Sequence, residues 1–296
     1  MKILLTGGTG FLGSNLLRRL LWLGHELFCI KRETSSLERV NFFKHKIKWF
    51  NLETSDFDEI ISSYKIEGII HCATDYGRKQ FNPIQTIETN LILPLKLLHA
   101  AANNNVLVFI NTDTVLDKRV DTYSLSKRQF SEWLEKYSND ILTINVALEH
   151  FYGPFDNDSK FVTYVIRKML GNEDSIDFTL GLQKRNFVYI EDVIDAFIVL
   201  LNNINKLDNS FHNFEVGTED SVTIKDFVGL VKKLCNNNTT DLNFGAINYR
   251  ENEVMNTNTN TDKLKSLGWF PKFSLEDGLK NTIDLEKKLK IENRII

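Results

Sequence analysis

The 296-residue chain contains only three cysteines, and their positions do not suggest a disulfide framework. Cys29, Cys72 and Cys235 are far apart in the sequence, and two of them lie in short apolar runs typical of strands. A buried free cysteine behaves as a small apolar side chain, and disulfides are rare in reducing compartments. We therefore expect free thiols and a cytoplasmic location.

Long apolar runs and an excess of one charge are also missing. No run approaches the roughly 20 residues of a membrane-spanning helix, and the apolar N-terminal segment is broken by glycines without a following cleavage site. The net charge of −3 does not favour nucleic acid or an anionic membrane as a partner. With 42% hydrophobic and 25% charged residues, the composition is typical of a globular protein, of one large or about two domains.

The most informative segment is at the start of the chain, where residues 2–14 read KILLTGGTGFLGS. A short apolar run predicts a buried strand, and the leucines that follow the glycines predict an amphipathic helix. Between them, Gly7, Gly10 and Gly13 have the spacing of a turn that lets a pyrophosphate approach the backbone at a helix N-terminus. An ordinary strand-to-helix turn is the alternative, but the context favours a dinucleotide site.

Strand and helix patterns alternate along the first half. Strands are expected at residues 27–30, 47–50, 68–72, 107–111 and 142–147, and helices at 55–64, 84–102 and 121–138. Pro94 should kink the second helix or begin its second half. This alternation predicts an α/β fold, a doubly wound parallel sheet with right-handed crossovers.

After residue 150 the alternation becomes irregular. Helical patterns occur at residues 161–170, 191–201, 223–235 and 275–289, with short strands at 187–190 and 211–216. We therefore expect a nucleotide-binding domain at residues 1–150 and a smaller substrate lobe at 151–296, with some of the chain crossing back. Doubly wound sheets bind ligands at the carboxyl ends of their strands.

The end of the second strand bears on the choice of dinucleotide. An acid at this place accepts a hydrogen bond from a free ribose hydroxyl, whereas a basic residue suits a 2′-phosphate. Here Lys31 and Arg32 occupy the place, and Arg binds phosphate in a bidentate manner. This pair favours NADP over NAD, although Glu33 follows one residue later and leaves NAD open.

A Tyr-x-x-x-Lys pair, Tyr123 and Lys127, lies in the helix after the fifth predicted strand. Residues at i and i+4 share a helix face, and a nearby ammonium favours the phenolate, so we expect a lowered pKa for Tyr123. Such a phenol can exchange a proton at physiological pH. In the preceding loop, Thr112 can donate a hydrogen bond to a carbonyl or alkoxide oxygen, although an ordinary turn threonine looks the same.

A series of motifs in one order makes the resemblance specific. The series comprises TGGTGFLGS, HCAT, NTD, YSLSK, FYGP, RNFVYIEDV, an arginine in NYRENE and a closing LGWFPKFSLEDGL. The chain resembles extended short-chain dehydrogenases/reductases of the NAD-dependent epimerase/dehydratase (nucleotide-sugar) family over nearly its whole length. The resemblance implies a Rossmann-type sheet, a nicotinamide cofactor and a nucleoside-diphosphate sugar as substrate.

The resemblance also implies roles for individual residues. The catalytic Ser/Thr, Tyr and Lys of the family correspond to Thr112, Tyr123 and Lys127. Its cofactor site corresponds to Gly7, Gly10, Phe11, Leu12, Lys31, Arg32, Asn51, Leu52, Cys72, Ala73 and Thr74, with Tyr123 and Lys127. Asn51 departs from the usual aspartate beside adenine. Arg185 and Arg250 correspond to the arginines that bind the diphosphate, and no metal is implied.

Two departures narrow the reaction. The family's 4,6-dehydratases have Thr-Asp-Glu after strand five, and this chain has Thr112-Asp113-Thr114, so the base that dehydration needs is missing. Another branch, which epimerises before it reduces, has a cysteine at the position of Thr114. The features that hydride transfer needs are all present: the cofactor site, Thr112 and Tyr123. On the sixth strand, Ala147 and His150 replace an Arg and an Asn of many relatives.

The combination CATDYGR, NTDT, YSLSK and LEHFYGP resembles the CDP-abequose synthase type of 4-ketoreductase. This resemblance implies NADPH-dependent reduction of the 4-keto group of a CDP-linked deoxysugar, a precursor of bacterial-type surface polysaccharide. The expected substrate contacts are Tyr76, Arg78, Asp113, His150, Arg185 and Arg250. His71 is expected to be a packed strand-end residue.

Two other functions stay open. One is a C4 epimerase with tightly held NAD, against which Lys31 and Arg32 argue. The other is a non-catalytic NADP-sensing regulator, which would be expected to lose Tyr123 or Lys127. Relatives commonly form homodimers through the helices that here span residues 84–103 and 121–138, and the apolar content of both helices allows this.

Overall fold

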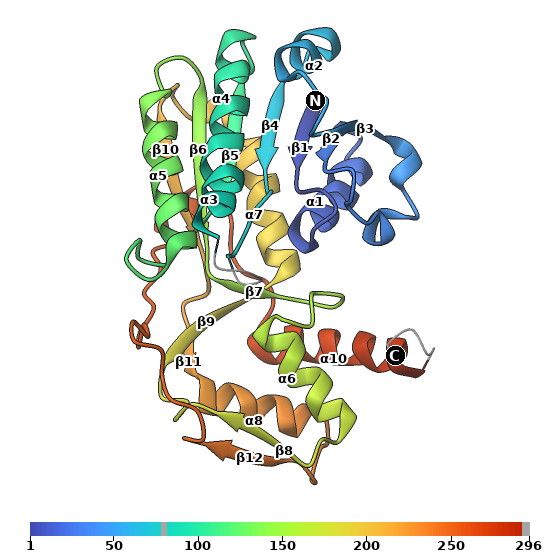
Figure 1. Cartoon of the computed structure of the whole chain (residues 1–296), viewed down its shortest axis with the longest axis vertical. Coiled ribbons are helices and arrows are strands. Elements are labelled where there is room, and N and C mark those ends of the chain that lie inside the picture. The colour runs from blue at the N-terminus through green and yellow to red at the C-terminus, as the bar shows by residue number, and fades with distance from the viewer. Residues whose placement is uncertain (78–81, 292–296) are drawn as a thin grey trace. The chain divides into compact units, whose positions relative to one another are not determined.

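The computed structural model describes residues 1–77 and 82–291 of the chain. These residues form two compact units (Figure 1). The first unit combines Met1–Leu148 with Ala196–Glu215, and the second combines Glu149–Asp195 with Val216–Ile296. The chain therefore leaves the first unit at Leu148 and returns to it once.

The first unit is built on a seven-stranded sheet with the order β10-β6-β5-β4-β1-β2-β3. The pairs among β1–β6 are all parallel, as the alternation of strands and helices predicts. The strands are β1 (Lys2–Thr6), β2 (Glu26–Lys31), β3 (Ile47–Asn51), β4 (Gly68–His71), β5 (Val108–Thr114), β6 (Leu142–Leu148) and β10 (Phe211–Val216). The prediction of a Rossmann-type doubly wound sheet is confirmed.

Helices cover the sheet through their apolar sides. On one face, Leu4 and Phe109 of the strands belong to one buried cluster with Leu97 of α4 and Phe130 of α5. On the other face, Leu17 of α1 and Leu5 of β1 meet beside Gly8. The helices are α1 (Phe11–Trp22), α2 (Phe57–Tyr64), α3 (Pro83–Ile87), α4 (Leu93–Asn103), α5 (Thr122–Lys136) and α7 (Ile190–Asn202), with short 3-10 turns η1 (Glu38–Val40), η2 (Lys44–Lys46) and η4 (Ile204–Lys206).

Pro94 has the effect that the sequence predicts. The long helical pattern consists of α3, a π-helical turn η3 (Glu88–Ile92) and then α4, with Pro94 in the first turn of α4. Proline has no N–H to donate, so it is tolerated where a new helical segment begins.

The strand at residues 211–216 is placed differently from the expectation. The sequence suggested a short strand of the irregular second half, but it is β10, the edge strand beside β6. Thr143 of β6 donates its backbone N–H to the Ser210 carbonyl at 3.3 Å. Local pattern cannot show this pairing, because the two segments are joined only by tertiary structure.

The second unit has a three-stranded sheet, β11-β9-β7, and a parallel pair, β12-β8. Its helices α6, α8 and α10 pack on one another, and Arg167 of α6 pairs with the buried Glu286 of α10. Its elements are β7 (His150–Tyr152), α6 (Phe161–Gly171), β8 (Ser175–Phe178), β9 (Lys184–Tyr189), β11 (Ser221–Thr223), α8 (Ile224–Leu234), β12 (Asp241–Phe244), α9 (Asp262–Ser266) and α10 (Leu275–Ile291). The longer helices match the expected ranges. The strands β7, β8, β11 and β12 were not predicted, because three or four residues are too few to show an alternating apolar pattern.

Across the described ranges 1–77 and 82–291, no helix is both long and apolar enough to cross a membrane.

Candidate active site

The glycine turn between β1 and α1 brings two backbone segments into contact. A Cβ at Gly7 would lie 2.6 Å from the Ala73 nitrogen, and one at Gly13 would lie 2.2 Å from the Gly7 carbonyl oxygen. Gly7 also has a φ of +71°, which favours glycine. Gly7 therefore lets the loop after β4 pass close to the turn, and Gly13 lets the first turn of α1 pack against Gly7 and Gly8.

The same turn fits a dinucleotide pyrophosphate. Gly10 is the N-cap of α1 and has no side chain with which to cap the first turn, where Phe11 and Leu12 follow. No acidic residue lies in that turn. An uncapped N-terminus of a twelve-residue helix attracts an anion through its N–H groups and its dipole.

The residues predicted to bind the adenosine part lie together at the carboxyl ends of β2 and β3. Lys31 is paired with Asn51, and the Leu52 N–H donates to the Lys31 carbonyl at 2.8 Å. The Lys31 ammonium donates to the Arg32 carbonyl at 3.3 Å, and Arg32 is exposed. Two cations thus stand at this edge of the sheet.

The loop after β4 is held to β1. Cys72 donates its N–H to the Thr6 carbonyl at 3.1 Å, and Ala73 donates its N–H to the Thr6 hydroxyl at 3.3 Å, one residue before Thr74. His71 is fully buried, with Nδ1 2.8 Å from the Thr6 hydroxyl. Burial lowers the pKa of His71 well below its usual value, so it is a neutral packed residue.

A capping box positions Tyr123 and Lys127. The Asp121 carboxylate accepts the Ser124 N–H at 2.8 Å, and the Ser124 hydroxyl lies 3.2 Å from the Asp121 nitrogen. The helix α5 therefore begins at Thr122, which places Tyr123 in its first turn and Lys127 one turn later. Lys127 is 1% exposed, and its ammonium donates to the Thr112 carbonyl at 2.7 Å.

The expected acidification of Tyr123 is wrong. Burial, then the neighbouring Tyr76 and Asp113, raise the pKa of the phenol well above its usual value. Burial also lowers the pKa of Lys127 to about 8. A buried phenol is costly to ionise, and the ammonium that should favour its phenolate is bound to a carbonyl instead. The phenol is protonated at neutral pH and is therefore a proton donor.

The two threonines of β5 differ in what they contact. The Thr112 hydroxyl donates to the His71 carbonyl at 3.0 Å, and the side chain is buried. The Thr114 hydroxyl, in contrast, accepts the Leu116 N–H at 3.2 Å, and the side chain lines a polar cavity. Sequence reasoning assigned the catalytic hydroxyl to Thr112. Thr112 and Thr114 share one face of β5, because side chains alternate with a period of two along a strand.

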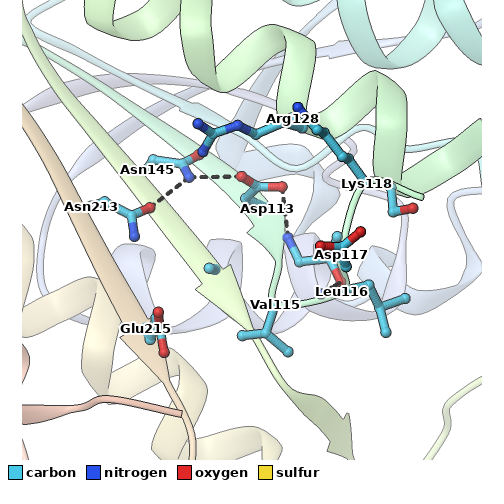
Figure 2. Close-up of a pocket in the computed structure, with 12 residues that line it drawn as sticks. Asp113, Val115, Leu116, Asp117, Lys118, Arg128, Asn145, Asn213 and Glu215 are labelled. Atoms are coloured by element: carbon cyan, nitrogen blue, oxygen red, sulfur yellow. Dashed lines mark hydrogen bonds between the residues drawn. The ribbon is translucent and has the colours of Figure 1, made fainter. Parts of the chain in front are cut away.

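A chain of hydrogen-bonded polar side chains runs from Asp113 across the sheet (Figure 2). The Asn145 amide donates to Asp113 at 2.7 Å and to Asn213 of β10 at 2.8 Å. The Asn111 amide in turn donates to Asn145 at 2.8 Å. Asp113 and Thr114 line a cavity of about 330 Å³ together with Asn145 and Asn213. The polar amides Asn145 and Asn213 were not identified from the sequence.

Of the two residues expected on the loop after β4, one is described. The Tyr76 ring lies 5.0 Å from the Tyr123 ring, centroid to centroid, at 38°. Tyr76 is therefore next to the phenol. Arg78 lies outside the described residues.

In the second unit, one carboxylate brings the two predicted diphosphate-binding arginines together. Arg185 forms an ion pair with Glu253 and donates to the Val254 carbonyl at 2.5 Å. The Arg250 Nε lies 3.8 Å from Glu253, and the Arg250 side chain is 82% exposed. Arg185 is thus rigidly held, whereas Arg250 is open to solvent.

His150 is on β7, next to a buried carboxylate that the sequence analysis missed. Glu149 accepts a hydrogen bond from the Thr259 hydroxyl at 2.6 Å, and its other oxygen lies 3.4 Å from His150 Nδ1. The His150 ring is 6.1 Å from that of Phe187, edge to face. The Nδ1 atom of His150 therefore faces Glu149, and the His150 side chain is 41% exposed.

The fold and the site of the first unit define a Rossmann-type α/β protein with the Tyr-Lys pair of the short-chain dehydrogenases/reductases. The model of the NAD dependent epimerase/dehydratase family matches residues 3–217. The chain belongs to this family.

Similarity to CDP-abequose synthases over most of the chain supports this membership. The chain is 35% identical to a CDP-abequose synthase of Salmonella muenchen, over 97% of this chain and 98% of that protein. It is 30% identical to the CDP-abequose synthase of Yersinia pseudotuberculosis, over 86% and 91% of the two chains.

Solved structures agree on the fold. The UDP-glucose 4-epimerase of Thermotoga maritima, solved with UDP-glucose, has a TM-score of 0.85 at 23% identity, covering 98% of this chain and 100% of that one. The UDP-glucuronic acid 4-epimerase of Bacillus cereus, in complex with UDP-glucuronic acid and NAD, has a TM-score of 0.85 at 22% identity, with the same coverage.

Proposed function

We propose that the protein is an NADPH-dependent reductase of the 4-keto group of a CDP-linked deoxysugar, which provides a precursor of surface polysaccharide. The observation that carries the proposal is the placement of Tyr123 in the first turn of α5, with its ring against Tyr76 and one helical turn before the buried Lys127. Reduction of a ketone needs a proton donor at the forming alkoxide, and a tyrosine phenol, which is protonated at neutral pH, can supply that proton. The similarity to CDP-abequose synthases supports the CDP-sugar.

In this mechanism, the bound dinucleotide supplies the hydride. Tyr123 donates its phenolic proton to the oxygen of the former ketone, and a threonine hydroxyl of β5 hydrogen-bonds the same oxygen. Lys127, held by the Thr112 carbonyl, supports the end of the helix that positions Tyr123 and contributes a cation for the cofactor ribose. Glycines 7, 10 and 13 accommodate the pyrophosphate on the backbone.

The second unit contributes the residues proposed to bind the nucleotide sugar. Arg185 and Arg250 suit a diphosphate because guanidinium groups form paired hydrogen bonds with phosphate oxygens. Glu253 holds Arg185 in place while Arg250 keeps its donors exposed. His150, with its ring set by Glu149 and Phe187, is proposed as a further contact to the sugar or a phosphate.

NADP is proposed over NAD because of Lys31 and Arg32. Both lie at the end of β2, where this fold binds the adenosine ribose. Lys31 occupies the position where an acidic residue would bind the ribose hydroxyl of NAD. Solved relatives of the same fold contain NAD.

The second candidate function is a nucleotide-sugar C4 epimerase. It is favoured by the fold shared with the epimerases and by an intact Tyr-Lys pair, which that reaction also needs. An epimerase oxidises and reduces the same carbon and returns its cofactor unchanged. A protein that carries NAD through purification and interconverts sugars without added cofactor would support this function.

The test is a coupled assay of NADPH consumption. CDP-, dTDP- and GDP-linked 4-keto sugars are offered in turn, and the product is analysed by NMR. Oxidation of NADPH with a CDP-linked 4-keto-deoxysugar and a new C4 alcohol is the expected result. Tight NADPH binding without oxidation across the panel would contradict a reductase and support a nucleotide-sensing role.

A further inference from the structure

We propose that Glu149 is a positioning residue that holds the His150 imidazole as its Nδ1–H tautomer, so that Nε2 accepts a hydrogen bond from a hydroxyl of the sugar. This role rests on the proposed function, since it needs a nucleotide sugar as the substrate. It selects the sugar, rather than a phosphate, as the partner of His150.

Glu149 is a buried carboxylate with few partners. Its side chain is fully buried, which is costly for a carboxylate unless hydrogen bonds compensate. Within residues 1–77 and 82–291, two side chains provide them: Thr259 donates its hydroxyl proton to Oε1 at 2.6 Å, and His150 Nδ1 lies 3.4 Å from Oε2. The Glu149 backbone is fixed as well, because its N–H donates to the Val216 carbonyl at 3.1 Å.

The partner on the first oxygen is fixed by close packing. A Cβ at Gly217 would lie 2.8 Å from the methyl carbon of Thr259, so glycine lets Thr259 approach the backbone there. Thr259 gives its single hydroxyl proton to Oε1, and Oε2 is left for His150. A carboxylate buried at this cost beside an exposed imidazole indicates a role in orienting that ring.

The chemistry of the carboxylate decides the tautomer. Its oxygens accept hydrogen bonds and donate none, so a nitrogen that bonds to Glu149 must carry the proton. In a neutral imidazole only one nitrogen is protonated, and the hydrogen bond of one nitrogen sets the state of the other. With the proton on Nδ1, the Nε2 of His150 has a free lone pair. It can accept a hydrogen bond from a hydroxyl, but it has no proton to donate to a phosphate oxygen.

Aromatic contacts fix the plane of the ring. His150 of β7 is in register with Phe187 of β9, and the two ring centroids are 6.1 Å apart, edge to face. Phe187 in turn stacks on Phe227 of α8, with ring centroids 4.1 Å apart. The His150 side chain is 41% exposed, and no described residue forms a hydrogen bond with its Nε2. This nitrogen is therefore held in one orientation and is open to a ligand.

The first test reads the tautomer by ¹⁵N NMR, in which the chemical shifts of Nδ1 and Nε2 distinguish the two neutral forms. His150→Asn assigns the signal among the six histidines. At alkaline pH we expect the Nδ1–H form in the wild type and a shift toward the Nε2–H form in Glu149→Gln. A carboxamide has N–H donors as well as an acceptor, so it no longer dictates which nitrogen is protonated. Glu173→Gln, at an exposed position just after α6, is the matched control.

The second test adds CDP-glucose, a CDP-linked sugar that has no ketone to reduce. The Nε2 signal of His150 should move as expected of a nitrogen that accepts a hydrogen bond, and CDP alone should leave it nearly unchanged. The same movement with CDP alone would assign the hydroxyl to the ribose. Protonation of both nitrogens on binding would assign His150 to a phosphate. Either result, or an unchanged signal with CDP-glucose bound, overturns the assignment to the sugar.

A double-mutant cycle shows whether Glu149 acts through His150. His150→Ala should raise KM for the nucleotide sugar up to about tenfold, the usual worth of one hydrogen bond, and leave kcat nearly unchanged. Glu149→Gln should also raise KM, and this rise should disappear when His150 is already alanine. The cycle is needed because Glu149 also acts on Arg185: burial lowers the pKa of that guanidinium, and the charges of Glu253 and Glu149 oppose the effect.

Two results would overturn the positioning role. One is the Nε2–H form of His150 in the wild type, and the other is an equal effect of Glu149→Gln on KM with and without His150. If the wild type neither binds CDP-glucose nor reduces a keto sugar, the proposed function fails, and the tautomer of His150 in the wild type and in Glu149→Gln still tests the action of Glu149 on the ring.

Discussion

The ammonium of Lys127 donates a hydrogen bond to the main-chain carbonyl of Thr112 at 2.7 Å, so the lysine of the Tyr-Lys pair is held by the strand that precedes its helix. Lys127 is buried, and burial lowers its pKa to about 8. Burial, followed by the neighbouring Tyr76 and Asp113, raises the pKa of the Tyr123 phenol on the same helix.

Tyr123→Phe should lower kcat by about 100-fold or more, because general acid catalysis typically contributes 10²–10⁴-fold. NADPH affinity should stay near that of the wild type, since the ring remains. Tyr137→Phe, which removes the phenol of the C-cap residue of the same helix, bonded to His99 at 3.1 Å, is the control. Steady-state NADPH oxidation is the measurement, and near wild-type turnover in Tyr123→Phe would reject the assignment.

Lys127 should make the free energy of unfolding increase as the pH rises above 8. Its pKa is lowered from 10.5 to about 8 in the fold, so the unfolded chain binds more protons between these values. This linkage favours the folded state by up to about 3 kcal/mol as pH rises from 8 to 10.5. The raised pKa values of Tyr123 and Cys72 oppose the gain at high pH, but do so in every variant that keeps these residues.

The contribution of Lys127 is isolated by the difference between wild type and Lys127→Met in urea unfolding at pH 7 and pH 9.5. The wild type should gain free energy of unfolding relative to the variant as pH rises. Lys136→Met, at an exposed position of the same helix, should show no such trend. If the difference in free energy of unfolding stays constant with pH, burial does not disfavour the charged form of Lys127.

Lys31→Ala combined with Arg32→Ala should weaken NADPH binding about tenfold or more and leave NADH binding nearly unchanged. The 2′-phosphate loses two cations, each forming charge-assisted hydrogen bonds, while the rest of the dinucleotide is untouched. Lys46→Ala, an exposed cation just before β3, is the control. Fluorescence titration gives both dissociation constants, and equal weakening for the two cofactors would remove the reason for preferring NADP.

Arg185→Ala should raise KM for the nucleotide sugar about tenfold or more without changing NADPH affinity, because a charge-assisted contact to the diphosphate is lost. The change also leaves the Glu253 carboxylate without its ion pair, so Arg185→Ala with Glu253→Gln separates the two effects. Arg39→Ala, an exposed position of η1, is the control. An unchanged KM in the double variant would place the diphosphate elsewhere.

The homodimer expected through the helices around β5 is open to a direct test. Exposed apolar side chains occur on these helices, with Leu125 and Trp133 on α5 exposed by 43% and 41%. We expect Trp133→Glu to convert a dimer into a monomer, since a buried interface does not tolerate an unpaired charge. Trp22→Glu on α1, where the side chain is 78% exposed, is the matched control. Light scattering after gel filtration gives the mass, and a monomeric wild type would contradict the dimer.

Much of the first unit could be predicted because its signals are local. The strand, glycine turn and helix at residues 2–22, and the Tyr-Lys pair at one helical turn, each depend on spacing within a few residues. The place of β10 and the network from Asn111 to Asn213 depend on strands far apart in the sequence. No local pattern contains such pairings.

By itself, the amino-acid sequence determined the doubly wound sheet, the glycine turn and the shared helix face of Tyr123 and Lys127, because backbone periodicity and glycine sterics decide these features. Only the tertiary structure decided that the pKa of Tyr123 is raised, that the Thr112 hydroxyl bonds the His71 carbonyl, and that Glu253 joins Arg185 and Arg250. The reason is physical: a pKa and a hydrogen-bond partner depend on burial and on neighbours that folding brings together.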